Sequence, residues 1–191
     1  MAQVRVLVLR APGVNCDAET QFAFELAGAL VERIHVNQVC ASPEVLEGFQ
    51  ILCVPGGFSY GDDIAAGAVL ASRMRTRLGD ALRAFRDRDG LILGICNGFQ
   101  TLLKTGLLVE PDPANGRPRA TLAFNRNGRF EDRWVYLRVT PGRTPFLKDS
   151  GILTMPVAPA ERAFRVENPN LLAQLNDEQR IIVLYADASG A

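Results

Sequence analysis

The sequence predicts an α/β fold, in which a doubly wound, mostly parallel sheet is followed by added antiparallel strands. Short apolar runs at 4–9, 51–54 and 91–95 are typical of strands that are buried on both faces of a parallel sheet. Segments with apolar residues at helical spacing lie between these runs, which gives a repeating strand and helix order. Ligands of such sheets bind beyond the carboxyl ends of the strands, so we expect the site in the loops there.

The remaining elements of the first half follow from turn residues and from apolar spacing. Turn and N-cap residues at 10–17 precede a helix over 18–29, in which Phe22 and Leu26 are one helical turn apart. Further expected elements are a strand at 30–36, a helical turn at 43–46, a long helix within 64–89 that is broken or bent near Gly79, and a short helix at 99–104 that Gly106 ends.

The second half changes to alternating and aromatic segments at 120–124 and 133–139. The turn-rich segment 125–128 separates them, which predicts an antiparallel meander. Strands at 152–158 and 180–185 and a helix that runs from Asn168-Pro169 to 175 complete the expected elements. Because a typical domain has roughly 150 residues, we expect the 191 residues to form one domain over 1–191.

Composition excludes several classes of protein. The chain is 48% apolar and 22% charged, as in globular proteins, and 21 basic residues balance 21 acidic ones. This balance argues against a nucleic-acid or anionic-membrane partner. Its apolar runs are far shorter than the ~20 residues of a membrane span, and its N-terminus lacks the pattern of a secretory signal. We therefore expect a cytoplasmic protein.

Cysteine and histidine limit the possible chemistry. Cys16, Cys40, Cys53 and Cys96 are scattered and form no Cys-x-x-Cys pair, so we expect free thiols and no metal site. His35 is the single histidine. This count excludes a metal site with several imidazoles, and it excludes any catalytic triad that does not use His35.

Segment 94–98, with the sequence GICNG, has the form of a nucleophile elbow with cysteine at its centre. A tight turn between strand and helix strains the central residue, and the two glycines avoid collisions with the adjoining elements. The helix N-terminus beside Cys96 favours the thiolate and leaves the amide of Asn97 free to bind an oxyanion. The alternative is a buried cysteine with glycines that serve close packing.

A second unusual loop, 54–63, follows the neighbouring strand with the sequence VPGGFSYGDD. An acyl-transfer site needs two main-chain donors around the developing charge, and the Gly57 region is a candidate for the second. The alternative is a simple glycine-rich turn. The loop has neither the Walker nor the dinucleotide-binding spacing.

Three segments, 10–17, 55–63 and 94–100, together closely resemble the glutaminase subunits of phosphoribosylformylglycinamidine synthase. These subunits are class I glutamine amidotransferases of purine biosynthesis. The similarity continues at 134–139 and 156–158. The resemblance implies a flavodoxin-like fold and hydrolysis of glutamine through a cysteinyl thioester, with ammonia passed to a separate ATP-dependent synthetase subunit.

The resemblance also implies the roles of particular residues. Cys96 would be the nucleophile, the amides of Gly57 and Asn97 the oxyanion hole, and Gln100 a contact to the bound glutamine. It implies no cofactor on this chain, because ATP and Mg²⁺ bind to the partner synthetase.

The sequence departs from that family at the catalytic base. Family members have a histidine and a glutamate in a C-terminal Pro-His-Pro-Glu-Arg segment, which these 191 residues lack, and Pro159 stands where the family tends to have another histidine. We therefore expect a C-terminally incomplete chain. His35 lies on a predicted strand rather than on a loop beside Cys96, so we interpret it as a structural histidine. One alternative is a catalytically silent docking subunit. Another is a PfpI-like thiol hydrolase in which Glu19 assists Cys96, although Glu19 is more simply an exposed helical carboxylate.

Overall fold

The computed structural model describes residues 3–140, 144–147 and 149–191. The chain divides into a first unit, Met1–Thr121, and a second unit, Leu122–Ala191, and each has its own internal contacts. The expectation of one domain over 1–191 stays a prediction.

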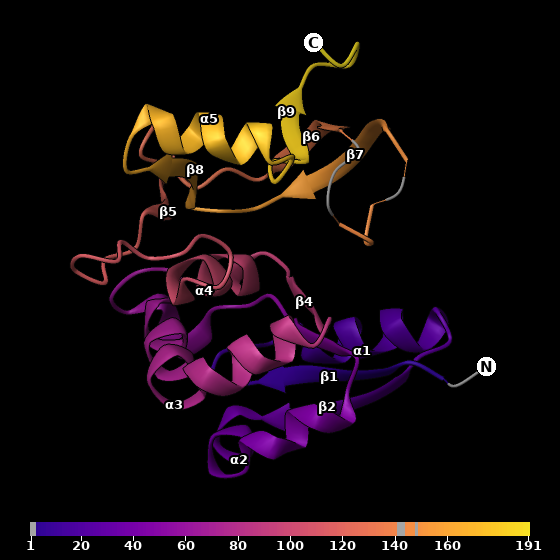
Figure 1. Ribbon diagram of the computed structural model, residues 1–191. Helices are drawn as coiled ribbons and strands as arrows, with labels where there is room; N and C mark the ends of the chain where they lie inside the picture. Colours follow the sequence, from indigo (N-terminus) through magenta and orange to yellow (C-terminus); the bar gives the residue numbers. More distant parts are fainter. Residues whose placement is uncertain (1–2, 141–143, 148) are drawn as a thin grey trace. The chain divides into compact units, whose positions relative to one another are not determined.

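The first unit is built on a parallel sheet. Its strands lie in the order β2-β1-β3-β4 and are β1 (Arg5–Arg10), β2 (Leu30–His35), β3 (Ile51–Val54) and β4 (Leu91–Gly94). All three neighbouring pairs are parallel. The chain starts on β1, adds β2 on one side and then continues with β3 and β4 on the other side (Figure 1). The strand order therefore reverses between β1 and β3, as in a doubly wound fold, which confirms the predicted fold class.

Helices cover both faces of this sheet. They are α1 (Asp17–Leu26), α2 (Val36–Ala41), α3 (Ala68–Asp87) and α4 (Asn97–Thr105), with short 3-10 helices η1 (Pro43–Gly48) and η2 (Ser59–Asp62). Val6 and Val8 of β1 pack on the same side as Phe24 of α1. Leu7 and Leu9 belong to the larger core, which contains residues of α2, α3 and α4. Because alternate side chains enter two different cores, every position in the middle of β1 is apolar.

The long helix α3 runs through Gly79 without a break, so the expectation of a broken helix there was wrong, and a bend at Gly79 stays a prediction. Leu70, Met74 and Leu78 form a buried stripe one turn apart. Packing of this stripe outweighs the cost of about 1 kcal/mol for one glycine in a helix. Helix α4 ends at Gly106, whose φ of +84° is left-handed, as predicted.

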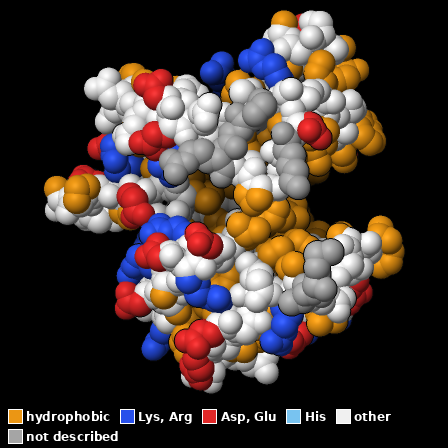
Figure 2. All heavy atoms as spheres, turned by 45° about the vertical axis from the view of Figure 1, so that its right-hand side comes forward, with side chains coloured by type: hydrophobic (Ala, Val, Ile, Leu, Met, Phe, Trp, Pro, Cys, Tyr) orange, Lys and Arg blue, Asp and Glu red, His pale blue; other side chains and the backbone are white. Residues whose placement is uncertain are grey.

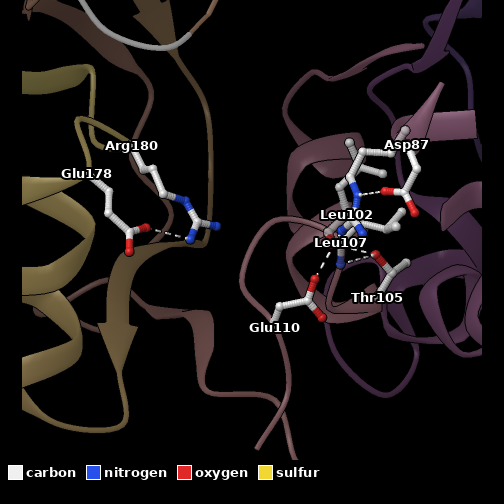
Figure 3. A network of polar contacts seen from close by, with 8 residues as sticks. Asp87, Leu102, Thr105, Leu107, Glu110, Glu178 and Arg180 are labelled. Carbon is white, nitrogen blue, oxygen red and sulfur yellow. Dashed lines mark hydrogen bonds and ion pairs between the residues drawn. The ribbon is translucent and has the colours of Figure 1, made fainter. Parts of the chain in front are cut away.

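Polar contacts hold the last turns of α3 and α4 (Figure 3). The hydroxyl of Thr105 donates to the carbonyl of Leu102 (2.6 Å) and accepts from the N–H of Leu107 (3.3 Å). Arg86 of α3 pairs with Asp87 and with Glu110, at 3.0 Å each. These contacts fix the chain that follows α4 against α3, and thereby support the helix that begins beside Cys96.

In its described residues, the second unit contains a three-stranded antiparallel sheet, a pair of strands and one helix. Its elements are β5 (Ala120–Phe124), β6 (Arg133–Val139), β7 (Gly151–Val157), β8 (Glu161–Val166), α5 (Pro169–Asp177) and β9 (Val183–Ala186). Strand β6 lies between β7 and β9, and β5 pairs with β8. The Asn168 carboxamide accepts from the N–H of Leu171 (3.0 Å) and caps α5.

The predicted pairing of β5 with β6 was wrong. Asn125 and Gly128 do form a turn (2.9 Å), but the N–H of Asn125 donates to the carbonyl of Ala160 (2.9 Å). The Asn125 side chain donates to the carbonyl of Pro159 (2.8 Å). The turn is thus tied to the segment that precedes β8, which brings β8 rather than β6 beside β5. Pro159, which stands where the similar family tends to have a histidine, thus takes part in this structural contact through its carbonyl.

The surface carries both signs of charge. On the face that Figure 2 draws, Lys and Arg side chains are interspersed with Asp and Glu. Among the helices in the described part of the chain, none is long and apolar enough to cross a bilayer. In residues 3–140, 144–147 and 149–191, no three His, Cys, Asp or Glu side chains come together as a metal site.

Candidate active site

Three loops converge where β1, β3 and β4 end. Val54 and Gly94, the last residues of β3 and β4, are partners in the sheet register. A Cβ atom built on Gly56 would lie 3.4 Å from the Cβ of Cys96 and 3.7 Å from the Sγ of Cys16. The nucleophile elbow, the loop after β3 and the loop after β1 therefore meet at one edge of the sheet, as the sequence predicted.

The backbone at Cys96 is strained, and the thiol is exposed. Its φ of +52° and ψ of −114° lie in a region that costs L residues of order 1–3 kcal/mol. A Cβ on Gly94 would lie 2.7 Å from a methyl carbon of Leu102, and a Cβ on Gly98 would lie 1.8 Å from the carbonyl oxygen of Val54. Both glycines are thus required by close contacts, and the contact at Gly98 is with the neighbouring strand β3.

Two main-chain N–H groups in the loops that meet here have no protein acceptor among the described residues. Asn97 is the first residue of α4, where an N–H has no partner within the helix. Within the described residues, the N–H groups of Asn97 and Gly57 donate to no protein acceptor. Gly57 has a φ of +136°, and a Cβ there would lie 2.6 Å from the carbonyl oxygen of Gly13. Free donors of this kind are able to stabilise an oxyanion.

The loop after β1 holds the loop after β3 in place. The N–H of Phe58 donates to the carbonyl of Gly13 (2.8 Å), and the N–H of Cys16 donates to the carbonyl of Gly56 (3.3 Å). Asp17, 8% exposed, anchors the first of these loops. Its carboxylate pairs with Arg10 (2.9 Å) and with Arg33 (3.1 Å).

Cys16 is a second thiol at the same edge of the sheet. It occupies the N-cap position of α1, and its carbonyl accepts from the N–H (3.1 Å) and the hydroxyl (2.6 Å) of Thr20. Burial raises the pKa of the Cys16 thiol, and the negative charges of Glu19, Cys96 and Asp17 raise it further. Cys16 therefore stays a neutral thiol at neutral pH.

His35 lies elsewhere and has a structural role. It is the N-cap of α2. Its ring Nδ1 accepts from the backbone N–H of Asn37 (3.1 Å), and its backbone N–H donates to the side chain of Gln38 (3.3 Å). The strand order places β2 three strands from β4, which is about 14 Å at the usual spacing. The interpretation of His35 as a structural histidine is confirmed.

The remaining candidate residues are placed as follows. Glu19 is exposed on the first turn of α1, and its charge acts on Cys16, whereas the thiol-hydrolase alternative needs it at Cys96. Gln100 is buried, and its Oε1 accepts from the side chain of Asn97 (3.2 Å). Its contact to a bound glutamine stays a prediction.

Two side chains that contact the site were not singled out by the sequence analysis. Ser59 and Asp62, both in η2, make hydrogen bonds to the buried carboxamide of Asn97. The only signal in the sequence was the presence of polar residues in the loop 54–63, and this did not indicate a partner across the site.

A strained cysteine at the edge of a parallel sheet is typical of α/β enzymes with a nucleophile elbow. Comparison with known families agrees with this class. Residues 3–191 match the model of the CobB/CobQ-like glutamine amidotransferase domain, and the chain belongs to this family. The resemblance found in the sequence is thereby confirmed.

Individual relatives are more specific. The chain is 46% identical over 191 residues to the phosphoribosylformylglycinamidine synthase subunit PurQ of Dehalococcoides mccartyi, covering all of the chain and 72% of the relative. It is 36% identical over 186 residues to the same subunit of Methanococcus maripaludis, covering 97% and 68%. Among solved structures, PurLQS from Thermotoga maritima is similar with a TM-score of 0.74 and 27% identity, over 97% of this chain and 76% of that one.

Proposed function

We propose that this chain is a glutaminase subunit of phosphoribosylformylglycinamidine synthase, acting in the cytoplasm in purine biosynthesis. The observation that carries the proposal is the exposed sulfur of Cys96, held on a strained turn that is followed by the free N–H of Asn97 and approached by the loop with the free N–H of Gly57. Similarity to PurQ over the whole chain supports this subunit rather than another amidotransferase.

The geometry suits acyl transfer. The sulfur of Cys96 attacks the side-chain carbonyl carbon of glutamine, and the electron pair of the C=O bond moves to oxygen. The N–H groups of Gly57 and Asn97 stabilise this negative charge, and loss of one such donor costs about 10²–10³-fold in rate. Collapse of the intermediate breaks the C–N bond, and ammonia leaves with one added proton. Water then cleaves the thioester, which releases glutamate and restores the thiol.

The partner in this proposal is the ATP-dependent synthetase subunit, which receives the ammonia. ATP and Mg²⁺ bind to that partner, and this chain needs no cofactor. Similarity to the structure of PurLQS supports an assembly with other subunits. The balanced net charge of the chain agrees with a protein partner rather than a nucleic acid.

A catalytically silent docking subunit is the second candidate, because His35 caps α2 far from Cys96. Proton transfers during thioester formation and hydrolysis are typically accelerated 10²–10⁴-fold by a positioned base. In the part of the chain that the structure describes, no imidazole faces Cys96. Turnover therefore distinguishes the two candidates.

The test has two measurements. Ammonia release from glutamine is measured for the protein alone and with its synthetase, and Cys96 modification by a chloroketone analogue of glutamine is followed by mass spectrometry. The proposal expects both signals, protection of Cys96 by glutamine, and loss of both in Cys96→Ala. The control Cys40→Ala changes a half-buried thiol of α2 and should keep them. Modification of Cys96 without release of ammonia would identify the silent subunit. If the chloroketone does not modify Cys96, the proposal of a glutaminase is wrong.

A further inference from the structure

The Asn97 side chain is buried between the loop after β3 and the start of α4. Only 2% of the residue is exposed, and its carboxamide makes four hydrogen bonds. Its Oδ1 accepts from the N–H (3.2 Å) and the hydroxyl (2.6 Å) of Ser59. Its Nδ2 donates to Oδ1 of Asp62 (2.9 Å) and to Oε1 of Gln100 (3.2 Å). The full donor and acceptor capacity of the amide is therefore used.

The partners determine which way the amide faces. A backbone N–H, such as that of Ser59, is only a donor, and Oδ1 of Asp62 is an acceptor, because it also receives the backbone N–H of Gly67. The oxygen of Asn97 must face Ser59 and its nitrogen must face Asp62. Aspartate at position 97 would keep the first contact, but it would place two carboxylates together in place of the second. The site therefore requires the amide group of asparagine at position 97, and a side chain of the same size is not sufficient.

The network connects three parts of the site. Asn97 follows the nucleophile, Ser59 lies two residues after Gly57, and Oδ1 of Asp62 also accepts from the N–H of Gly67 (3.0 Å) just before α3. Within η2, the backbone at Asp62 is left-handed with a φ of +52°. Such a conformation persists only where its surroundings hold it, and the contacts of Asp62 supply that restraint.

We propose that the Asn97 carboxamide is a positioning group, which sets the spacing between the main-chain N–H groups of Gly57 and Asn97 by tying their two loops together. This inference rests on the proposed thioester chemistry at Cys96. The N–H groups belong to loops that follow different strands, so their separation depends on contacts between the loops. A displacement of about 1 Å at a reacting centre is enough to lower a rate roughly 10²-fold.

The experiment compares two reagents at Cys96, each followed by peptide mass spectrometry. The chloroketone analogue of glutamine needs the binding site and a stabilised carbonyl oxygen, whereas iodoacetamide needs only an accessible thiol. The ratio of the two rates therefore reports on the oxyanion donors and not on exposure of the sulfur. The variants are Asn97→Asp, Asp62→Asn and the milder Ser59→Ala. The control Asn170→Asp makes the same chemical change at an exposed position of α5.

Asn97→Asp should lower the ratio at least tenfold, and Ser59→Ala should lower it less. Thermal unfolding identifies a variant that does not fold, and Ser59→Ala then decides the question, since it removes one hydrogen bond and leaves the amide in place. An unchanged ratio in the folded variants overturns the positioning role. If the chloroketone fails on the wild-type protein while iodoacetamide modifies Cys96, the proposed function fails and this inference fails with it.

Discussion

Replacement of Gly98 by alanine should displace the nucleophile loop. The added Cβ would lie 1.8 Å from the oxygen of Val54, 2.6 Å from its carbonyl carbon, and 2.9 Å from the oxygen of Pro55. All three atoms belong to the main chain around the end of β3. A flexible side chain is able to move aside, but this backbone is held in the sheet between β1 and β4.

The size of the effect follows from that overlap. Real Cβ atoms do not approach other heavy atoms within 3.0 Å, so the start of α4 must move away from β3 by more than about 1 Å. Overpacking of this kind typically costs about 1–3 kcal/mol of stability. Because Cys96 and Asn97 lie directly before Gly98, the same movement displaces the sulfur and one oxyanion donor, which predicts a loss of roughly 10²-fold in rate.

The assay measures chloroketone modification of Cys96 together with thermal unfolding of Gly98→Ala. Gly151→Ala is the matched control, because no atom lies within 4 Å of a Cβ at Gly151 and its φ is not left-handed. The control should resemble the wild type in both measurements. A Gly98→Ala protein with wild-type stability and a wild-type modification rate would refute the close-contact argument for the elbow.

Three other predictions concern stability. Gly79→Ala in α3 should raise the free energy of unfolding by roughly 0.5–1 kcal/mol, since its Cβ would make only ordinary contacts with Arg83; an unchanged or lower melting temperature would contradict this. Burial raises the pKa of Cys53 to about 12 from 9.0. The unfolded chain therefore loses this proton first, and the free energy of unfolding should fall by about 1.4 kcal/mol per pH unit between pH 9 and about 12. Urea denaturation at several pH values should show a shallower decline in Cys53→Ala, and parallel declines would argue against the shift. Asp17→Asn should cost about 1–2 kcal/mol in urea denaturation, because the charged contacts to Arg10 and Arg33 are lost; an unchanged midpoint would show that these pairs contribute nothing.

Local patterns explain which elements the sequence predicted well. Strand β3 and strand β6 have the predicted bounds, since an apolar run or an alternating segment bounded by turn residues needs no distant partner to be recognised. Helix α2, Val36–Ala41, was missed. It is only six residues long, and its first residue continues the apolar pattern of β2. Its start depends on the hydrogen bonds between His35 and Gln38.

Local sequence patterns could not predict which distant segments pair in a sheet. The partner of β5 is β8, and this choice depends on the contacts of Asn125 with Pro159 and Ala160. Any two alternating segments beside a turn are compatible with a hairpin, so the sequence could not exclude the pairing of β5 with β6.

The strained turn at Cys96 could be read from the sequence alone. The spacing of Gly94, Cys96 and Gly98 between an apolar strand and a helix already requires a tight turn that exposes the sulfur. The hydrogen bonds around that turn, by contrast, could be seen only in the folded structure. Ser59 and Asn97 lie 38 residues apart and meet because β3 and β4 are neighbours in the sheet. Hydrogen bonds of this kind depend on distance and direction in space, and these are settled only when the whole sheet has formed.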